Sequence, residues 1–206
     1  MKLRIVSLSV LALCLVAVPA VAQTLYSNGP INGTTDAWTI NFGFAVSDTF
    51  TLSGPAAANT IEFGAWAEPG DILLNADVGI SSAEFGGTTY FDGLVSFTQS
   101  GCSANQYGYN VCTESGTYGP VNLAAGTYWV TLSNAVVNTG DPIYWDENSG
   151  PSSASENSVG TIPSEAFTID GTTTTTSSGS VPEPSSIMLF GSGILGLAGL
   201  LRRKLF

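Results

Sequence analysis

Residues 126–133 read GTYWVTLS, and their alternation decides the fold class. Tyr128, Val130 and Leu132 occupy every second position, which places them on one face of a β-strand. The same period of two recurs in AWTINFGF at 37–44, TIEFGAWA at 60–67 and TTYFDGLVSFTQ at 88–99. A helix would repeat its apolar residues at a spacing near 3.6, and the central region shows no such stripe. These stretches therefore predict half-buried β-strands.

The expected inner faces follow from this alternation. They comprise Trp38, Ile40, Phe42 and Phe44 in the first stretch, Ile61, Phe63 and Ala65 in the second, and Phe91, Val95 and Phe97 in the third. Clusters of Gly, Pro, Asn and Asp, such as SNGPING at 27–33 and NTGDP at 138–142, separate the strands. Short strands with this punctuation predict an all-β domain over residues 23–170, an antiparallel β-sandwich of the jelly-roll type.

The N-terminal segment has the features of a secretory signal peptide. Lys2 and Arg4 precede an apolar run, and Ala20, Val21 and Ala22 form a small-residue cleavage site. We therefore predict a signal peptide at residues 1–22, with a mature chain that begins at Gln23.

The C-terminal segment has the features of a membrane anchor. Residues 171–180, GTTTTTSSGS, carry no large apolar side chain, so we predict a flexible Thr/Ser linker there. Residues 185–201 carry no charge and as a helix would span ~26 Å, slightly less than a ~30 Å hydrocarbon layer. Arg202, Arg203 and Lys204 should stay cytoplasmic by the positive-inside rule. The sequence thus predicts one transmembrane helix at 185–201 and an ectodomain outside the cell.

The order of motifs in the tail, residues 181–206, resembles a known sorting signal. The stretch VPEPSSIMLFGSGILGLAGLLRRK, residues 181–204, resembles the PEP-CTERM signal of exported bacterial proteins, also described as an ice-binding protein C-terminal domain. The resemblance implies processing by an exosortase at the sorting motif, in a Gram-negative-type host that makes extracellular polysaccharide. The sorting motif comprises Val181, Pro182, Glu183 and Pro184. The name describes the tail alone, so no ice binding is implied, and a plain membrane anchor is the alternative.

The central region carries a second resemblance. LAAGTYWVTLSNA at 123–135 and IYWDENSG at 143–150 are similar to a strand and a Trp-containing loop in the jelly-roll ectodomains of such sorted proteins. This resemblance implies a fold and names no ligand.

The charge distribution excludes several classes of function. Residues 23–181 contain fifteen Asp and Glu residues and no Lys or Arg, and the whole chain has no His. Such a domain repels phosphate backbones, so we expect no nucleic-acid binding. A Ser nucleophile would lack a His base, and phosphoryl transfer would lack Lys and Arg. The chemistry that remains is a carboxylate pair acting on a glycoside, for which the adjacent Asp146 and Glu147 are poorly placed on a strand. We therefore expect no enzymatic activity.

Two cysteines, Cys102 and Cys112, remain after the signal peptide. An exported chain meets an oxidising compartment, and this spacing suits a disulfide that closes a loop, worth ~2–3 kcal/mol. A metal-binding pair is the alternative, but the mature chain offers no His or third Cys to complete a zinc site.

Two clusters combine aromatic rings with amides or carboxylates, as saccharide sites do. DPIYWDENSG at 141–150 contains Tyr144, Trp145, Asp146 and Glu147, and NQYGYN at 105–110 contains Tyr107 and Tyr109. The alternative is that these side chains are ordinary core and edge residues. The spacing of Asp141, Asp146 and Glu147 could also hold a structural calcium ion, although the usual calcium loop is absent; we predict no other metal or cofactor.

These features together predict an exported cell-surface or extracellular-matrix protein. Its non-catalytic β-domain would be adhesive or carbohydrate-binding, with extracellular polysaccharide as the partner. A carboxylate-dependent glycan-acting enzyme and a passive coat protein are the alternatives.

Overall fold

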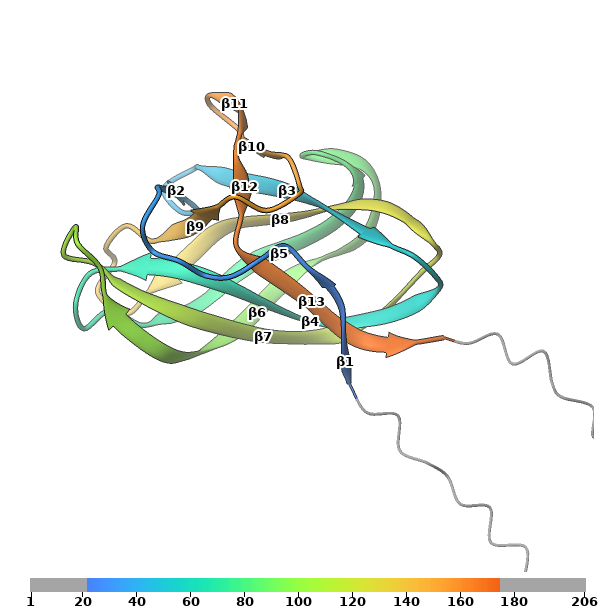
Figure 1. Cartoon of the computed structure of the whole chain (residues 1–206), viewed down its shortest axis with the longest axis horizontal. Coiled ribbons are helices and arrows are strands. Elements are labelled where there is room, and N and C mark those ends of the chain that lie inside the picture. The colour runs from blue at the N-terminus through green and yellow to red at the C-terminus, as the bar shows by residue number, and fades with distance from the viewer. Residues whose placement is uncertain (1–21, 175–206) are drawn as a thin grey trace, which may run out of the picture. The chain divides into compact units, whose positions relative to one another are not determined.

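The computed structural model describes residues 22–174, which form β-strands joined by turns (Figure 1). The strands, in chain order, are β1 (Gln23–Ser27), β2 (Ala37–Thr39), β3 (Ala45–Leu52), β4 (Ala56–Ala67), β5 (Leu73–Ala83), β6 (Gly86–Ala104), β7 (Asn110–Leu123), β8 (Gly126–Val137), β9 (Tyr144–Asn148), β10 (Ala154–Glu156), β11 (Gly160–Ile162), β12 (Ser164–Glu165) and β13 (Phe167–Thr173).

The strands form one antiparallel sheet that curls into a half-barrel (Figure 1). Along the sheet the order is β1-β13-β4-β7-β6-β5-β8-β3-β10-β11, and β2 and β12 join through β9. The prediction of an antiparallel all-β fold is confirmed. The predicted jelly-roll sandwich of two stacked sheets differs from this arrangement, because β6 belongs to both halves. Its first part pairs with β5 and its last part pairs with β7, so the hydrogen-bond ladder continues from one half into the other.

The core lies inside the curl, and the alternation identified its lining correctly in three strands. Ile61, Phe63 and Ala65 of β4 are fully buried. On the GTYWVTLS face of β8, Val130 and Leu132 are fully buried and Tyr128 is almost fully buried. Phe63 contacts Phe97 of β6 edge to face, with ring centroids 5.4 Å apart. Burying one such side chain contributes about 1.5–3 kcal/mol, so these inner faces supply much of the driving force for folding.

The first predicted strand is wrong beyond Ile40. β2 ends at Thr39, and the chain then turns, with the amide of Phe44 donating to Asn41 O at 3.0 Å. Phe42 sits in the left-handed region at φ 57° and is 63% exposed, so it lies outside the core face. The Asn41 side chain holds the turn by donating to Asp141 O at 3.0 Å. The residue that fixes this turn is a hundred positions away, so the local alternation of apolar and polar residues could not predict the turn.

The predicted linker begins too early. β13 continues through Gly171, Thr172 and Thr173, which pair with Ala58, Ala57 and Ala56 of β4. Gly171 is required in this register because a Cβ there would clash with Ala57 O. The rest of the predicted linker and the predicted transmembrane helix at 185–201 lie outside the described residues, as does all of the predicted signal peptide except Ala22.

The two ends of the described segment lie side by side. Gln23, the predicted first residue of the mature chain, opens β1 and pairs with Gly171 of β13. β4 then runs from Ala56, opposite Thr173, to Ala67, opposite Asn110. Twelve residues of strand cover roughly 35 Å at about 3.3 Å per residue. The β6–β7 turn, which precedes Asn110, is therefore at the far end of the domain from Gln23 and Thr173 (Figure 1).

Candidate binding site

The β6–β7 turn is a short hairpin that presents an exposed tyrosine. Asn105 accepts at Oδ1 from the amides of Tyr107 and Tyr109, at 2.9 and 3.0 Å. The backbone N–H of Asn105 donates to Tyr109 O at 2.8 Å, and Gly108 adopts a φ of 93° that closes the turn. Asn and Gly are the residues that such turns favour, so NQYGY folds back on itself locally. The result is that Tyr107 projects from the loop with 54% of its surface exposed.

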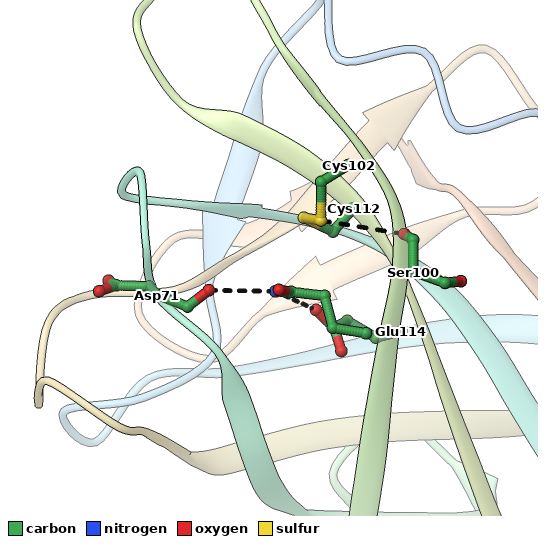
Figure 2. The surroundings of a disulfide bond; sticks show 6 residues. Asp71, Ser100, Cys102, Cys112 and Glu114 are labelled. Carbon is green, nitrogen blue, oxygen red and sulfur yellow. Dashed lines mark hydrogen bonds between the residues drawn. A yellow bond between two sulfur atoms is a disulfide. The ribbon is translucent and has the colours of Figure 1, made fainter.

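A disulfide between Cys102 and Cys112 ties the two strands just below this turn (Figure 2). Their Cα atoms are 4.1 Å apart, next to a register shift between β6 and β7. The predicted pairing is confirmed. Because the cross-link joins the strands at the base of the hairpin, it limits how far the tyrosine-bearing loop can open.

The aromatic residues predicted from two separate sequence clusters meet beside this hairpin. Tyr109 packs edge to face against Tyr144 of β9, with centroids 5.6 Å apart. Tyr107 stacks on Trp66 of β4 at 5.6 Å and an interplanar angle of 22°. Trp66 is not among the residues predicted from the sequence. Its signal was a large aromatic at an outward position of TIEFGAWA, where the alternation expects a polar side chain.

Asp146 connects this aromatic group to the loop between β1 and β2. Its carboxylate accepts from Trp66 Nε1 at 2.6 Å and from the amides of Asn32 and Gly33 at 2.8 and 3.0 Å. The side chain is fully buried, and burial raises its pKa against the opposing effect of these three donors. Asp146 therefore holds the β1–β2 loop against the end of the sheet.

A cavity of about 450 Å³ lies between the β1–β2 loop and the β6–β7 hairpin. Its lining is uncharged and mostly polar, and it comprises Ile31, Asn32, Gly33, Thr34, Gly101, Ser103, Ala104, Asn105, Gln106, Val111, Cys112 and Thr113. The hydroxyl of Tyr107 reaches across from the hairpin to within 3.5 Å of Thr34 O. The cavity thus combines amide and hydroxyl groups with an exposed aromatic ring at its edge.

The other residues of the predicted aromatic–acidic cluster are buried. Trp145 is fully buried, donates from Nε1 to Ala166 O at 3.0 Å and packs against Phe63 and Phe167. Glu147 is almost fully buried and accepts from Trp38 Nε1 at 3.0 Å. In this conformation Trp145, Asp146 and Glu147 are inaccessible to a ligand. Of the six predicted contact residues, Tyr107, Tyr109 and Tyr144 lie beside the hairpin with exposed surface.

Two further carboxylates, Asp48 and Glu165, are fully buried, and Glu165 pairs with Glu147 of β9. Asp48 Oδ2 accepts from the amide of Glu165 and from Ser152 Oγ, both at 2.8 Å, and burial raises the pKa of Asp48 to about 6. Neither carboxylate oxygen of Glu165 has a hydrogen-bond partner in the structure. Burial, followed by the nearby charge of Asp48 and other acids, holds the pKa of Glu165 well above its usual range.

These acids do not assemble into a metal centre. Within residues 22–174, no group of three or more acidic or cysteine side chains could hold a metal ion. Asp141 is exposed, whereas Asp146 and Glu147 are buried and occupied by N–H donors. The spacing that suggested calcium therefore does not form a ligand set in this structure.

Comparison with known proteins identifies the tail. Residues 180–204 match the family of the PEP-CTERM protein-sorting motif, which confirms the resemblance. The motif indicates an exported, cell-surface-sorted protein that an exosortase processes. No curated protein matches the chain. The described part, residues 22–174, contains no helix long and apolar enough to cross a membrane. The motif itself, the basic residues 202–204 and the signal-peptide residue Ala20 lie outside that part.

Proposed function

We propose that the β-domain binds a glycan, without catalysis, in the cavity beside the β6–β7 hairpin. The observation that carries this proposal is the combination of an uncharged polar cavity of about 450 Å³ with the exposed ring of Tyr107. A sugar ring has an apolar C–H face, which an aromatic plane can cover, and hydroxyl groups that need hydrogen-bond partners. The cavity offers both kinds of surface side by side.

The position of Tyr107 supports this role because the ring is held before any ligand arrives. It stacks on Trp66, and Trp66 is fixed by its hydrogen bond to the buried Asp146. Asn105 and the disulfide hold the hairpin from the other side. A preorganised aromatic surface loses little conformational freedom on binding, and this favours affinity.

The proposed site is also remote from the two ends of the described segment. It lies at the far end of the domain from Gln23 and Thr173, the residues nearest the signal peptide and the sorting tail. The role we propose is adhesive or structural, at the cell surface or in a matrix of extracellular polysaccharide.

A non-catalytic role is favoured by the chemistry of the cavity. Its lining contains no Asp or Glu, and glycoside hydrolysis ordinarily needs two carboxylates beside the scissile bond. Asp48 and Glu165 have the raised pKa of a general acid, but both are fully buried. The alternative, a glycan-acting enzyme, would require one of these groups to become exposed.

The test is a glycan array probed with the exported protein and two variants at one position. Tyr107→Ala removes the ring and should weaken binding by about tenfold or more, the usual cost of losing an aromatic anchor. Tyr107→Phe keeps the plane and loses only the hydroxyl, so it should bind nearly as well as the wild type. Binding that survives Tyr107→Ala would refute this site.

The same array separates the alternatives. Bound glycans that are recovered intact support the proposal. Cleavage of a bound glycan would favour the enzyme, and the absence of any hit would favour a passive coat protein.

A further inference from the structure

A second hollow lies on the outer face of the sheet, along β5, away from the hairpin. It has a volume of about 290 Å³ and is lined by Asp77, Gly79, Ile80, Ser81, Phe85, Gly86, Thr89, Phe91, Asp92, Thr131 and Ser133. The alternate β5 positions 77, 79 and 81 form its floor. β8 and β6 flank this floor on its two sides.

The hollow exists because β5 has a glycine at the centre of this outer face. Gly79 pairs with Asp92 of β6 on one side and with Thr131 of β8 on the other. Directly paired residues have Cβ atoms about 5 Å apart, so the missing side chain leaves open space between those two neighbours. A Cβ added at Gly79 would meet only Thr131 Cβ, at 3.6 Å, and Gly79 does not have a positive φ. The glycine is therefore not needed for backbone geometry, and its effect is the groove.

Two carboxylates border the groove with no opposite charge to neutralise them. Asp77 lies two residues before Gly79, and Asp92 lies directly opposite Gly79. Asp77 Oδ2 accepts from the neutral amide of Asn134 at 2.8 Å. Residues 22–174 contain no Lys, Arg or His, so no cationic side chain of the domain can neutralise these acids. The groove therefore offers a cationic group two anionic partners at once.

The remaining lining suits a polyhydroxylated ring. Thr131 and Ser133 place hydroxyl groups along the β8 side, and Phe85 closes one end at the β5–β6 turn. Phe85 is 42% exposed and has a φ of 50°, which an unstrained turn would give to glycine or asparagine. The groove therefore combines an exposed aromatic ring, hydroxyl groups and two carboxylates. This combination matches a saccharide that carries a protonated amine.

We propose that this groove is a second binding site, specific for amino-sugar units of a polysaccharide. The ammonium group would lie between Asp77 and Asp92, and the ring would extend towards Phe85. This proposal does not depend on the hairpin site, which lies beside the other end of β6. A domain with both sites could hold two polysaccharide segments together.

The experiment compares two short ligands that differ in charge. The exported protein is titrated calorimetrically with the trimer of glucosamine and with the trimer of N-acetylglucosamine, at about 0.15 M salt to screen non-specific attraction. We expect the amine form to bind. Replacing Asp77 and Asp92 with Asn should weaken its binding by about tenfold or more.

Two further variants make the test specific. Gly79→Val fills the groove while leaving both carboxylates in place, and a β-branched residue suits a strand, so the variant should fold and lose binding. Asp141→Asn removes one exposed charge outside the groove and should leave the affinity unchanged. Circular dichroism melting of each variant checks that the fold is retained.

The binding results of these variants distinguish the groove from the site beside the β6–β7 hairpin. Loss of amine binding in Gly79→Val and in the double Asn variant, with Tyr107→Ala unaffected, supports the groove. The proposal is overturned if the glucosamine trimer does not bind, if its N-acetylated form binds equally, or if Asp141→Asn weakens binding as much as the groove variants do.

Discussion

Glu114 in β7 is a fully buried glutamate, and replacing it with glutamine should reduce the pH dependence of folding stability. Its Oε1 accepts from Gln99 Nε2 at 2.9 Å, and Gln99 also donates to Asp71 O at 3.3 Å (Figure 2). Oε2 has no hydrogen-bond partner in the structure. Burial raises the pKa of Glu114 to about 7, against a smaller lowering effect of the Gln99 hydrogen bond.

The size of the effect follows from the difference between the folded pKa of about 7 and the usual 4.5. Because the folded pKa is raised, the protonated form is favoured in the folded state. The resulting stability is fully present below pH 4.5 and is lost as the pH rises through 7. Between roughly pH 5 and pH 8 this one group should lower the free energy of unfolding by about 2–3 kcal/mol.

The measurement is urea denaturation of the exported protein at pH 5 and pH 8 with the disulfide intact. The glutamine of Glu114→Gln cannot ionise, so the stability of this variant should fall about 2–3 kcal/mol less than that of the wild type between the two pH values. Because each protein is compared with itself at the two pH values, any pH-independent cost of burying the glutamine amide cancels. Glu68→Gln, at an exposed position, is the control and should follow the wild type. Equal pH dependence in wild type and Glu114→Gln would show that Glu114 is not titrating in a buried site.

Three other predictions concern what holds the fold together, each checked by chemical denaturation. Reducing the bond between Cys102 and Cys112 should lower the free energy of unfolding by about 2–3 kcal/mol, and free-thiol labelling of unreduced protein would contradict the pairing. Gly64→Ala should cost about 1–3 kcal/mol, because its Cβ would lie 2.8 Å from Ile31 Cγ2 and 2.9 Å from Asp146 Cβ. Gly119→Ala, where a Cβ meets nothing within 4 Å, is its control, and equal losses would refute the steric argument. Phe63→Ala should cost about 3–5 kcal/mol, and a loss below 1 kcal/mol would mean that its site is not close-packed.

Alternation predicted the strands whose two faces differ. In β8 and in β4 up to Phe63, one face lines the core and the other is more exposed, so the period of two is visible in the sequence. β9 gave no such signal because it pairs with β2, β4 and β12 and is buried on both faces. Trp145, Asp146 and Glu147 therefore looked like a surface cluster although they lie in the interior.

The candidate site could be predicted only in part, because long-range contacts assemble it. Tyr107 and Tyr109 were accessible to sequence reasoning, since NQYGYN is a local turn. Trp66 lies 41 positions before Tyr107, and the sheet order alone brings them together. The burial of the carboxylates Asp48, Glu114 and Glu165 was not predicted either, because it depends on the strands that pack around them and not on the local sequence.

The central claim is that this β-domain is exported and sorted through its tail. The most direct test is to measure the intact mass of the protein produced in a host with an active exosortase. The account predicts a chain that starts at Gln23, ends near Pro182–Pro184 and contains a closed disulfide. Replacing Pro182, Glu183 and Pro184 with Ala should leave the tail attached. A full-length chain in the cytosol with residues 1–22 still present, or an unaltered C-terminus in the exported protein, would contradict it.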